Sequence, residues 1–108
     1  MKYNGKMDRE CLGLCDAMNA LPGITTTESC CGHGLSNYHI WFRVREVQDL
    51  TPLHRAINHL YGGLAGWRIE VSWTENPTYS ILFDLVGPIG HGAYCGAEKI
   101  ASGIREER

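Results

Sequence analysis

The sequence lacks several features that would place it at once in a large class of proteins. Ten Lys and Arg residues stand against twelve Asp and Glu residues, for a net charge of −2. Proteins that bind long nucleic acids usually carry a strong basic excess, so this partner is not expected. No apolar run is long enough to span a membrane, and the first residues lack the apolar segment of a signal peptide. We therefore expect a cytoplasmic protein without a membrane partner.

A disulfide framework is also not expected. The chain has five cysteines, an odd number, and no secretory signal accompanies them. Free thiols are the usual state in a reducing cytoplasm. Internal repeats, low-complexity tracts and long linkers are missing as well, and 108 residues with 44% hydrophobic content suit one globular domain covering 1–108.

The periodicity of the apolar residues predicts seven elements in the order αββαββα. Helical spacing predicts helices over 8–20, from Asp49 until Gly62, and over 93–104. Alternation and β-branched content predict strands over 25–31, 38–44, 67–73 and 79–86, and 87–92 reads as a loop. The expected fold is a single α+β domain with a mostly antiparallel, four-stranded sheet and helices packed on one face.

Helices on one face leave the other face of the sheet open. By alternation, that face carries Trp41, Arg43, Arg68 and Glu70, with Asp84 as a further candidate. Trp and Arg are enriched in contact surfaces, so we expect this face to meet a ligand or a second subunit. Symmetric dimers are common, and a homo-oligomer, dimer or higher, is the expected assembly.

Two glycine-flanked histidines give the chain its most informative motif. Gly32-His33-Gly34 follows a predicted strand, and Gly90-His91-Gly92 precedes a predicted helix. Glycine allows the backbone to approach a ligand closely, and exposed backbone N–H groups can cradle an anion. We interpret the two segments as two sides of one binding site. The alternative, that both merely turn the chain, stays open.

The thiols permit two other interpretations. Cys30, Cys31 and His33 could hold zinc, but adjacent strand residues point to opposite faces, which disfavours a site with both thiols. Either thiol could instead pair with His33 or His91 as a nucleophile, with Glu28 or Asp84 orienting the imidazole. Core packing is the expected role of the remaining cysteines, namely Cys11, Cys15 and Cys95.

The leading hypothesis is non-catalytic binding of a small, phosphate-bearing, nucleotide-like molecule, with no cofactor. Cys30, Cys31, Gly32, Gly34, Gly90 and Gly92 belong to the segments that supply backbone donors. His33 and His91 hydrogen-bond polar ligand atoms. Arg43 pairs with phosphate, Trp41 stacks on a base, and Arg68 is a reserve contact.

Segment 26–33, Thr-Thr-Glu-Ser-Cys-Cys-Gly-His, resembles the Thr-Thr-Ser-Ser-Cys-Ser-Gly-Arg signature of the wybutosine-synthesis tRNA methyltransferase family. Trp41-Phe42-Arg43 is similar to a strand of that family. The resemblance implies a related α/β core with the Ser-Cys loop as the binding element, and a nucleotide- or RNA-modifying enzyme as the alternative function. Glu28, Cys31 and His33 depart from the signature, so methyl transfer is not carried over.

The longer pattern Leu-Pro-Gly-Ile … Glu-Ser-Cys-Cys-Gly-His-Gly, from Leu21 to Gly34, resembles a group of small bacteriophage proteins. This likeness covers most of the chain. It implies an anti-defence protein of the host cytoplasm that sequesters a nucleotide immune signal, such as a cyclic nucleotide or a cyclic ADP-ribose type molecule. A zinc-stabilised interaction module is the third alternative.

Overall fold

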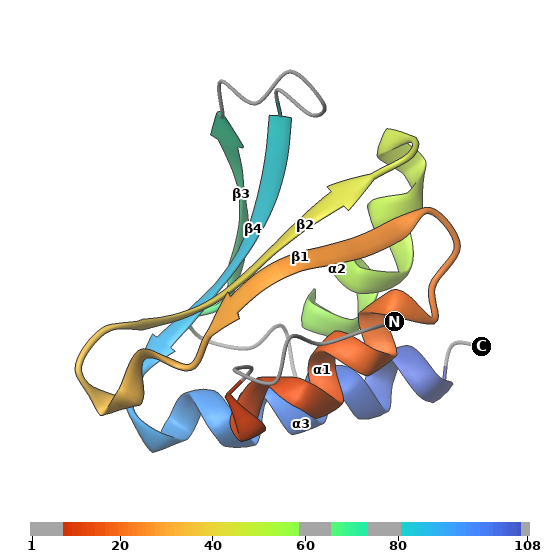
Figure 1. Ribbon diagram of the computed structural model, residues 1–108. Helices are drawn as coiled ribbons and strands as arrows, with labels where there is room; N and C mark the ends of the chain where they lie inside the picture. Colours follow the sequence, from red (N-terminus) through yellow and green to blue (C-terminus); the bar gives the residue numbers. More distant parts are fainter. Residues whose placement is uncertain (1–7, 59–65, 74–80, 107–108) are drawn as a thin grey trace.

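The structure, a computed structural model, describes residues 8–58, 66–73 and 81–106, and the elements follow the predicted order (Figure 1). The helices are α1 (Arg9–Asn19), α2 (Thr51–Asn58) and α3 (His91–Glu106). The strands are β1 (Ile24–Cys30), β2 (Asn37–Val44), β3 (Arg68–Trp73) and β4 (Ile81–Ile89). Two short 3₁₀ segments are η1 (Gly32–Gly34) and η2 (Val47–Leu50).

The four strands form one antiparallel sheet in the order β1-β2-β4-β3. The three helices lie on the same side of this sheet (Figure 1). The predicted α+β architecture, with a four-stranded antiparallel sheet covered on one face, is therefore confirmed. We call the uncovered side the open face.

The core lies between the sheet and the helices. Strict alternation along β2 sends Tyr38, Ile40 and Phe42 to this side, where all three are fully buried. Helical spacing does the same for α1 and α3, each of which buries one stripe of residues. The helical residues of the core include Cys11, Leu14, Cys15, Met18, Leu53, Ile57, Ala93, Ala97, Ile100 and Ile104.

Trp67, just before β3, fills a slot between the sheet and α3. A side chain at Gly87 of β4 would place its Cβ 2.7 Å from the Trp67 indole, and one at Gly96 of α3 would place it 2.5 Å away. Tyr38 meets the same indole edge-on, with ring centroids 5.3 Å apart. Two glycines thus make room for the largest side chain of the core.

The predicted loop over 87–92 is wrong. Strand β4 continues to Ile89, which pairs with Asn37, and α3 already begins at His91. The register shifts between Asn37 and Tyr38, so that Pro88, which has no N–H to donate, is the extra residue of a bulge. Pairing with β2 at this end of the sheet thus overrides the turn tendency of Gly and Pro.

Two other expectations need correction. The second helix does not start at Asp49: η2 comes first, and the Asp49 carboxylate accepts a hydrogen bond from the Glu46 N–H within a capping box. Cys95 is exposed on α3 and does not belong to the core. The predicted end of the second helix at Gly62 and the start of the fourth strand at Tyr79 lie outside the described residues.

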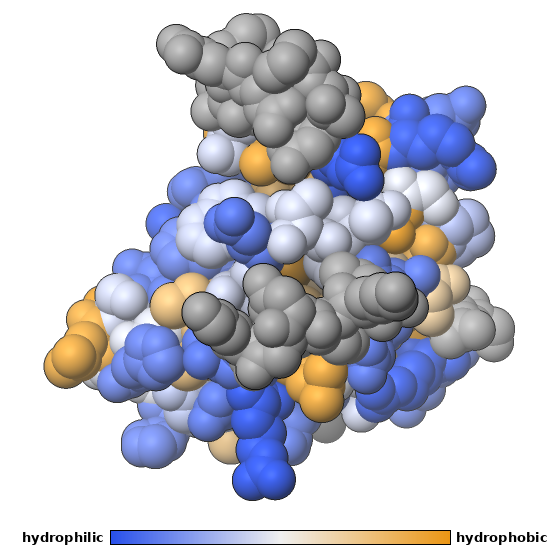
Figure 2. Space-filling view, viewed as in Figure 1, coloured by the Kyte–Doolittle hydropathy of each residue, from blue (hydrophilic) through white to orange (hydrophobic). Residues whose placement is uncertain are grey.

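Exposed large apolar side chains are few among the residues that the structure describes. Figure 2 shows a mainly hydrophilic side, with apolar side chains in small, separate groups. The exposed large apolar residues are Leu12, Leu35, Val47, Val71 and Ile89. None of the described helices is both long and apolar enough to cross a membrane.

Candidate functional site

Both glycine–histidine–glycine segments lie at the same end of the sheet. Asn37, which follows η1, pairs with Ile89, which precedes Gly90. The Asn37 side chain also donates a hydrogen bond to the Gly87 carbonyl at 2.9 Å, which fastens the start of β2 to the end of β4. We call this end, with residues 30–36 and 89–92, the loop end of the sheet.

The first cluster at the loop end consists of Asp8, Cys31 and His33. His33 Nδ1 lies 3.7 Å from Cys31 Sγ, and His33 Nε2 lies 3.7 Å from an Asp8 carboxylate oxygen. The same oxygen accepts a hydrogen bond from the Cys31 N–H at 2.9 Å. Asp8 sits at the N-cap position of α1, but its side chain is used on this loop and does not cap the helix. The cluster therefore links the start of α1 to the turn between β1 and β2.

Left-handed backbone shapes this turn. Gly32, His33 and Gly34 have φ values of 81°, 51° and 78°, and His33 is the only described residue other than glycine with a positive φ. Histidine tolerates this region better than most side chains. The turn brings the His33 N–H to 3.4 Å from Cys31 Sγ and folds the imidazole back over the thiol.

Burial and hydrogen bonding set the charge states in this cluster. Cys31 is only 2% exposed, and burial raises the pKa of its thiol. The hydrogen bond from the Cys31 N–H lowers the pKa of Asp8. At neutral pH the cluster therefore combines a protonated Cys31 thiol with an ionised Asp8 carboxylate.

Tyr94 of α3 connects the second segment to this cluster. A hydrogen bond between its hydroxyl and the Cys31 thiol raises the pKa of Tyr94. Its ring meets the His91 imidazole edge-on, with centroids 5.4 Å apart. Cys31 and His91 therefore share one neighbour, although no direct contact between His33 and His91 is seen.

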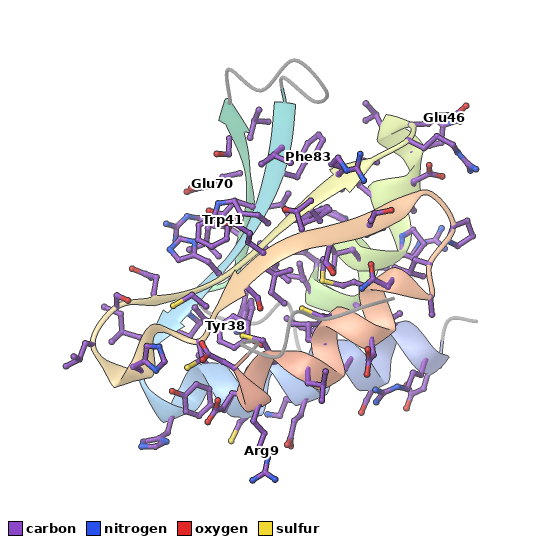
Figure 3. All side chains as sticks on the ribbon, in the orientation of Figure 1. Arg9, Tyr38, Trp41, Glu46, Glu70 and Phe83 are labelled. Carbon is purple, nitrogen blue, oxygen red and sulfur yellow. The ribbon has the colours of Figure 1, made fainter. Side chains whose placement is uncertain are left out.

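The second cluster lies on the open face and is centred on His39. The His39 Nδ1 is 2.9 Å from one carboxylate oxygen of Asp84, its neighbour on β4. The imidazole stacks on Trp41, with ring centroids 4.9 Å apart and an angle of 8° between the planes. Figure 3 shows Trp41 and Glu70 on the side of the sheet away from the helices, and Tyr38 between the sheet and the helices. Carboxylate, imidazole and indole thus form one ordered group on the open face.

The register defines the neighbours of this group. Cys30 is directly opposite His39, and Val86 and Arg68 continue the same row across the sheet. The next row carries Trp41 flanked by Glu28 and Asp84, followed by Glu70. Arg68 and Glu70 form an ion pair at 2.5 Å. The open face therefore carries both signs of charge.

Asp84 is unusual because it is only 6% exposed although the helices lie on the other side of the sheet. Burial raises its pKa, whereas the hydrogen bond with His39 lowers it. With a carboxylate on Nδ1, a neutral His39 carries its proton on that nitrogen and presents Nε2 as an acceptor.

The candidate residues named from the sequence fall into two groups. Cys31, Gly32, His33, Gly34, Gly90, His91 and Gly92 gather at the loop end, whereas Cys30, Trp41, Arg43 and Arg68 lie on the open face. Arg43 is six residues along β2 from Asn37, hence about 20 Å from the loop end. The expected split of Cys30 and Cys31 between two faces is confirmed, because Cys30 pairs with His39 while Cys31 is a core residue.

Three participants were missed by sequence reasoning. They are His39 of β2, Asp8 at the N-cap position of α1, and Tyr94 of α3. Alternation does put His39 and Asp84 on one face, but only the β2–β4 register shows that they touch. Asp84 pairs with His39, not with the two histidines that were considered as its partners.

A shallow hollow of about 530 Å³ lies between α1 and α3. It is lined by Arg9, Glu10, Gly13, Leu14, Tyr94, Ala97, Glu98, Ala101, Ser102 and Arg105. The Arg105 guanidinium donates to the Gly13 carbonyl at 3.4 Å across it. Its mixed charges and lack of a convergent polar group make it a weaker candidate than the two clusters.

Comparison of this chain with protein-family models, curated protein sequences and solved structures gave no significant match. The function is therefore argued from the two clusters alone.

Proposed function

We propose that the protein binds a small nucleotide-type ligand on the open face and holds it without converting it. The observation that carries this proposal is the stacked pair of Trp41 and His39 on a sheet face that the helices leave uncovered. Stacking of a base on an aromatic side chain contributes about 1–3 kcal/mol. In the proposed complex a base ring extends the existing stack.

The polar groups around the stack suit a nucleobase. Asp84 fixes the imidazole of His39 through Nδ1, so that Nε2 keeps one direction and remains available as a hydrogen-bond acceptor. A base has ring N–H and amino groups of matching character. Little side-chain freedom is lost on binding, because the ring pair is already ordered.

The charged side chains of the open face restrict the kind of phosphate ligand that can bind there. The open face carries the carboxylates Glu28, Glu70 and Asp84 and the guanidiniums Arg43 and Arg68. A polyphosphate would be repelled by this balance, whereas one phosphate or a cyclic phosphodiester can pair with a single Arg. We assign the phosphate to Arg43, next after Trp41 on the same face of β2, and keep Arg68 as the reserve contact.

Calorimetry with a panel of ligands tests this proposal. The panel contains adenosine and guanosine monophosphates, their cyclic forms, cyclic dinucleotides, cyclic ADP-ribose and ATP. We expect binding of at least one monophosphate or cyclic member, and a loss of about 5- to 150-fold in affinity for Trp41→Ala, from the stacking energy above. Trp41→Phe keeps a ring and serves as the matched control. Absence of heat with every member, or unchanged affinity in Trp41→Ala, would overturn the proposal.

Retention is tested separately. The bound ligand is released by denaturing the protein and weighed by mass spectrometry, and sequestration requires that it return intact. Native mass spectrometry of the complex also reports the number of subunits, for which we propose a dimer or higher homo-oligomer covering part of the open face.

One observation favours a second candidate, a thiol-dependent hydrolase of a nucleotide-like substrate. Cys30 pairs with His39 across the β1–β2 ladder, and the His39 imidazole is hydrogen-bonded to the Asp84 carboxylate. This is the order of groups in which a carboxylate orients an imidazole that activates a thiol. Cleaved ligand in the release experiment, together with lost turnover in Cys30→Ala but not in Cys95→Ala, would favour the hydrolase over sequestration.

A further inference from the structure

We propose that Asp8, Cys31 and His33 form a zinc site with an open fourth position. The three side chains each offer one ligand atom, and these atoms lie within 4.8 Å of one another. Carboxylate oxygen, thiolate sulfur and imidazole nitrogen are the three kinds of protein ligand that zinc takes.

The ligand atoms are close to the separations that a tetrahedral ion requires. With zinc bonds of about 2.3 Å to sulfur and about 2.0–2.2 Å to nitrogen or oxygen, tetrahedral geometry separates two ligand atoms by about 3.3–3.6 Å. Cys31 Sγ and His33 Nδ1 are 3.7 Å apart, as are His33 Nε2 and Asp8 Oδ2. These two contacts use different nitrogens of His33, and only one nitrogen can bind the ion, so the ring must turn to bring that nitrogen between Cys31 Sγ and the Asp8 carboxylate.

The backbone already holds the ligands in place. The His33 N–H points at Cys31 Sγ at 3.4 Å, and the Cys31 N–H fixes the Asp8 carboxylate at 2.9 Å. Such outer contacts orient metal ligands. The left-handed turn over Gly32, His33 and Gly34 lets two ligands only two residues apart face the same point.

The fourth position is open on the solvent side. Among residues 8–58, 66–73 and 81–106, no further Cys, His, Asp or Glu joins the group. The adjacent thiol of Cys30 belongs to the open face and not to this cluster. The His33 side chain is 67% exposed, which gives the ion access to water or to an anionic oxygen. Three protein ligands and one exchangeable position are typical of catalytic rather than structural zinc sites.

This proposal shares no residue with the ligand site assigned to Trp41, Arg43 and Arg68. An experiment can therefore refute the zinc site without affecting the proposed ligand site, and the reverse also holds.

Cobalt substitution tests the zinc site. Co²⁺ is titrated into the metal-free Cys95→Ser protein, in which the exposed thiol of α3 has been removed. We expect one equivalent to bind with a thiolate-to-cobalt absorption band in the near ultraviolet and visible bands of tetrahedral intensity, both abolished by one equivalent of Zn²⁺. Absence of the thiolate band would overturn the proposal.

The neighbouring cysteines provide the control pair. Cys31→Ser should lose the thiolate band, whereas Cys30→Ser should keep it, and equal behaviour of the two variants would contradict the assignment. Cys31 is buried, so its replacement can also lower the stability of the fold, and His33→Asn therefore gives an independent test. Asparagine also tolerates the left-handed backbone, and this variant should bind Co²⁺ about tenfold or more weakly. Co²⁺ binding should be unchanged in Trp41→Ala, which separates this proposal from the preceding one.

Discussion

The slot that holds Trp67 yields a prediction that runs against ordinary helix propensity. Gly96 lies in the middle of α3, where replacing glycine by alanine normally stabilises a helix by about 1 kcal/mol. Here the new Cβ would lie 2.5 Å from Nε1 and 3.0 Å from Cε2 of Trp67. Non-bonded heavy atoms prefer about 3.5–4.0 Å, so the indole or the helix must shift.

Gly13 supplies the matched control, because it lies in the interior of α1 and its Cβ would meet nothing within 4 Å. Gly13→Ala should raise the free energy of unfolding by about 0.5–1 kcal/mol. Overpacking costs about 1–3 kcal/mol, so Gly96→Ala should lower it by up to about 2 kcal/mol. The two variants should therefore differ by about 1–3 kcal/mol.

Urea denaturation followed by far-ultraviolet circular dichroism measures both values, with equal slopes confirming that only stability has changed. In a Trp67→Leu background the steric conflict disappears, and Gly96→Ala should then become neutral or stabilising. Equal gains for Gly96→Ala and Gly13→Ala in the otherwise unchanged protein would show that Trp67 does not occupy the slot.

Three further predictions concern other parts of the fold. Asn19→Ala should lower the free energy of unfolding by about 1–3 kcal/mol, because the Asn19 side chain accepts the hydrogen bond of the buried Thr26 N–H at 2.8 Å. The control Asn58→Ala removes an exposed hydrogen bond to a carbonyl and should change the free energy of unfolding by less than about 0.5 kcal/mol in the same urea assay. The raised pKa of Asp84 means that its contribution to stability is complete below pH 3.8 and declines as the pH rises through the raised value. Asp84→Asn should therefore flatten the fall in unfolding free energy above pH 3.8, and an unchanged slope would refute the burial of this carboxylate. Burial raises the pKa of Cys11 to about 11 and that of Cys15 to about 12, so a thiol reagent at pH 8 should label exposed Cys95 first and these two only after unfolding, as mass spectrometry of the labelled peptides will show.

Local patterns were sufficient to predict the elements of this fold. Alternation along β2 predicts Trp41 and Arg43 on the open face, where the structure has them, and helical spacing predicts the order of the helices. Alternation also predicts that the side chains of Cys30 and Cys31 point to opposite faces at the end of β1. These predictions hold because each depends on neighbours a few residues away.

The candidate site depends on long-range pairing, which no local pattern encodes. His39 and Asp84 are 45 positions apart, and their contact follows only from the register between β2 and β4. Asp8 reaches Cys31 because α1 packs beside the end of β1, and its N-cap position gave no hint of that partner. The segment from Gly87 to Ile89 is a strand and not the expected loop for the same reason, since β2 pairs with it despite Pro88.

The strand order has a consequence for how the chain folds. Among the described strands, β1 pairs only with β2, and β3 only with β4, so the sheet consists of two hairpins joined along the β2–β4 seam. Tyr38 of the first hairpin packs on Trp67, which precedes the second, and α1 of the first half lies against α3 of the last. Neither half can bury its apolar side alone, so we expect cooperative, two-state unfolding. The slow step should be the meeting of the halves, whose contacts span long stretches of chain and therefore cost the most loop entropy.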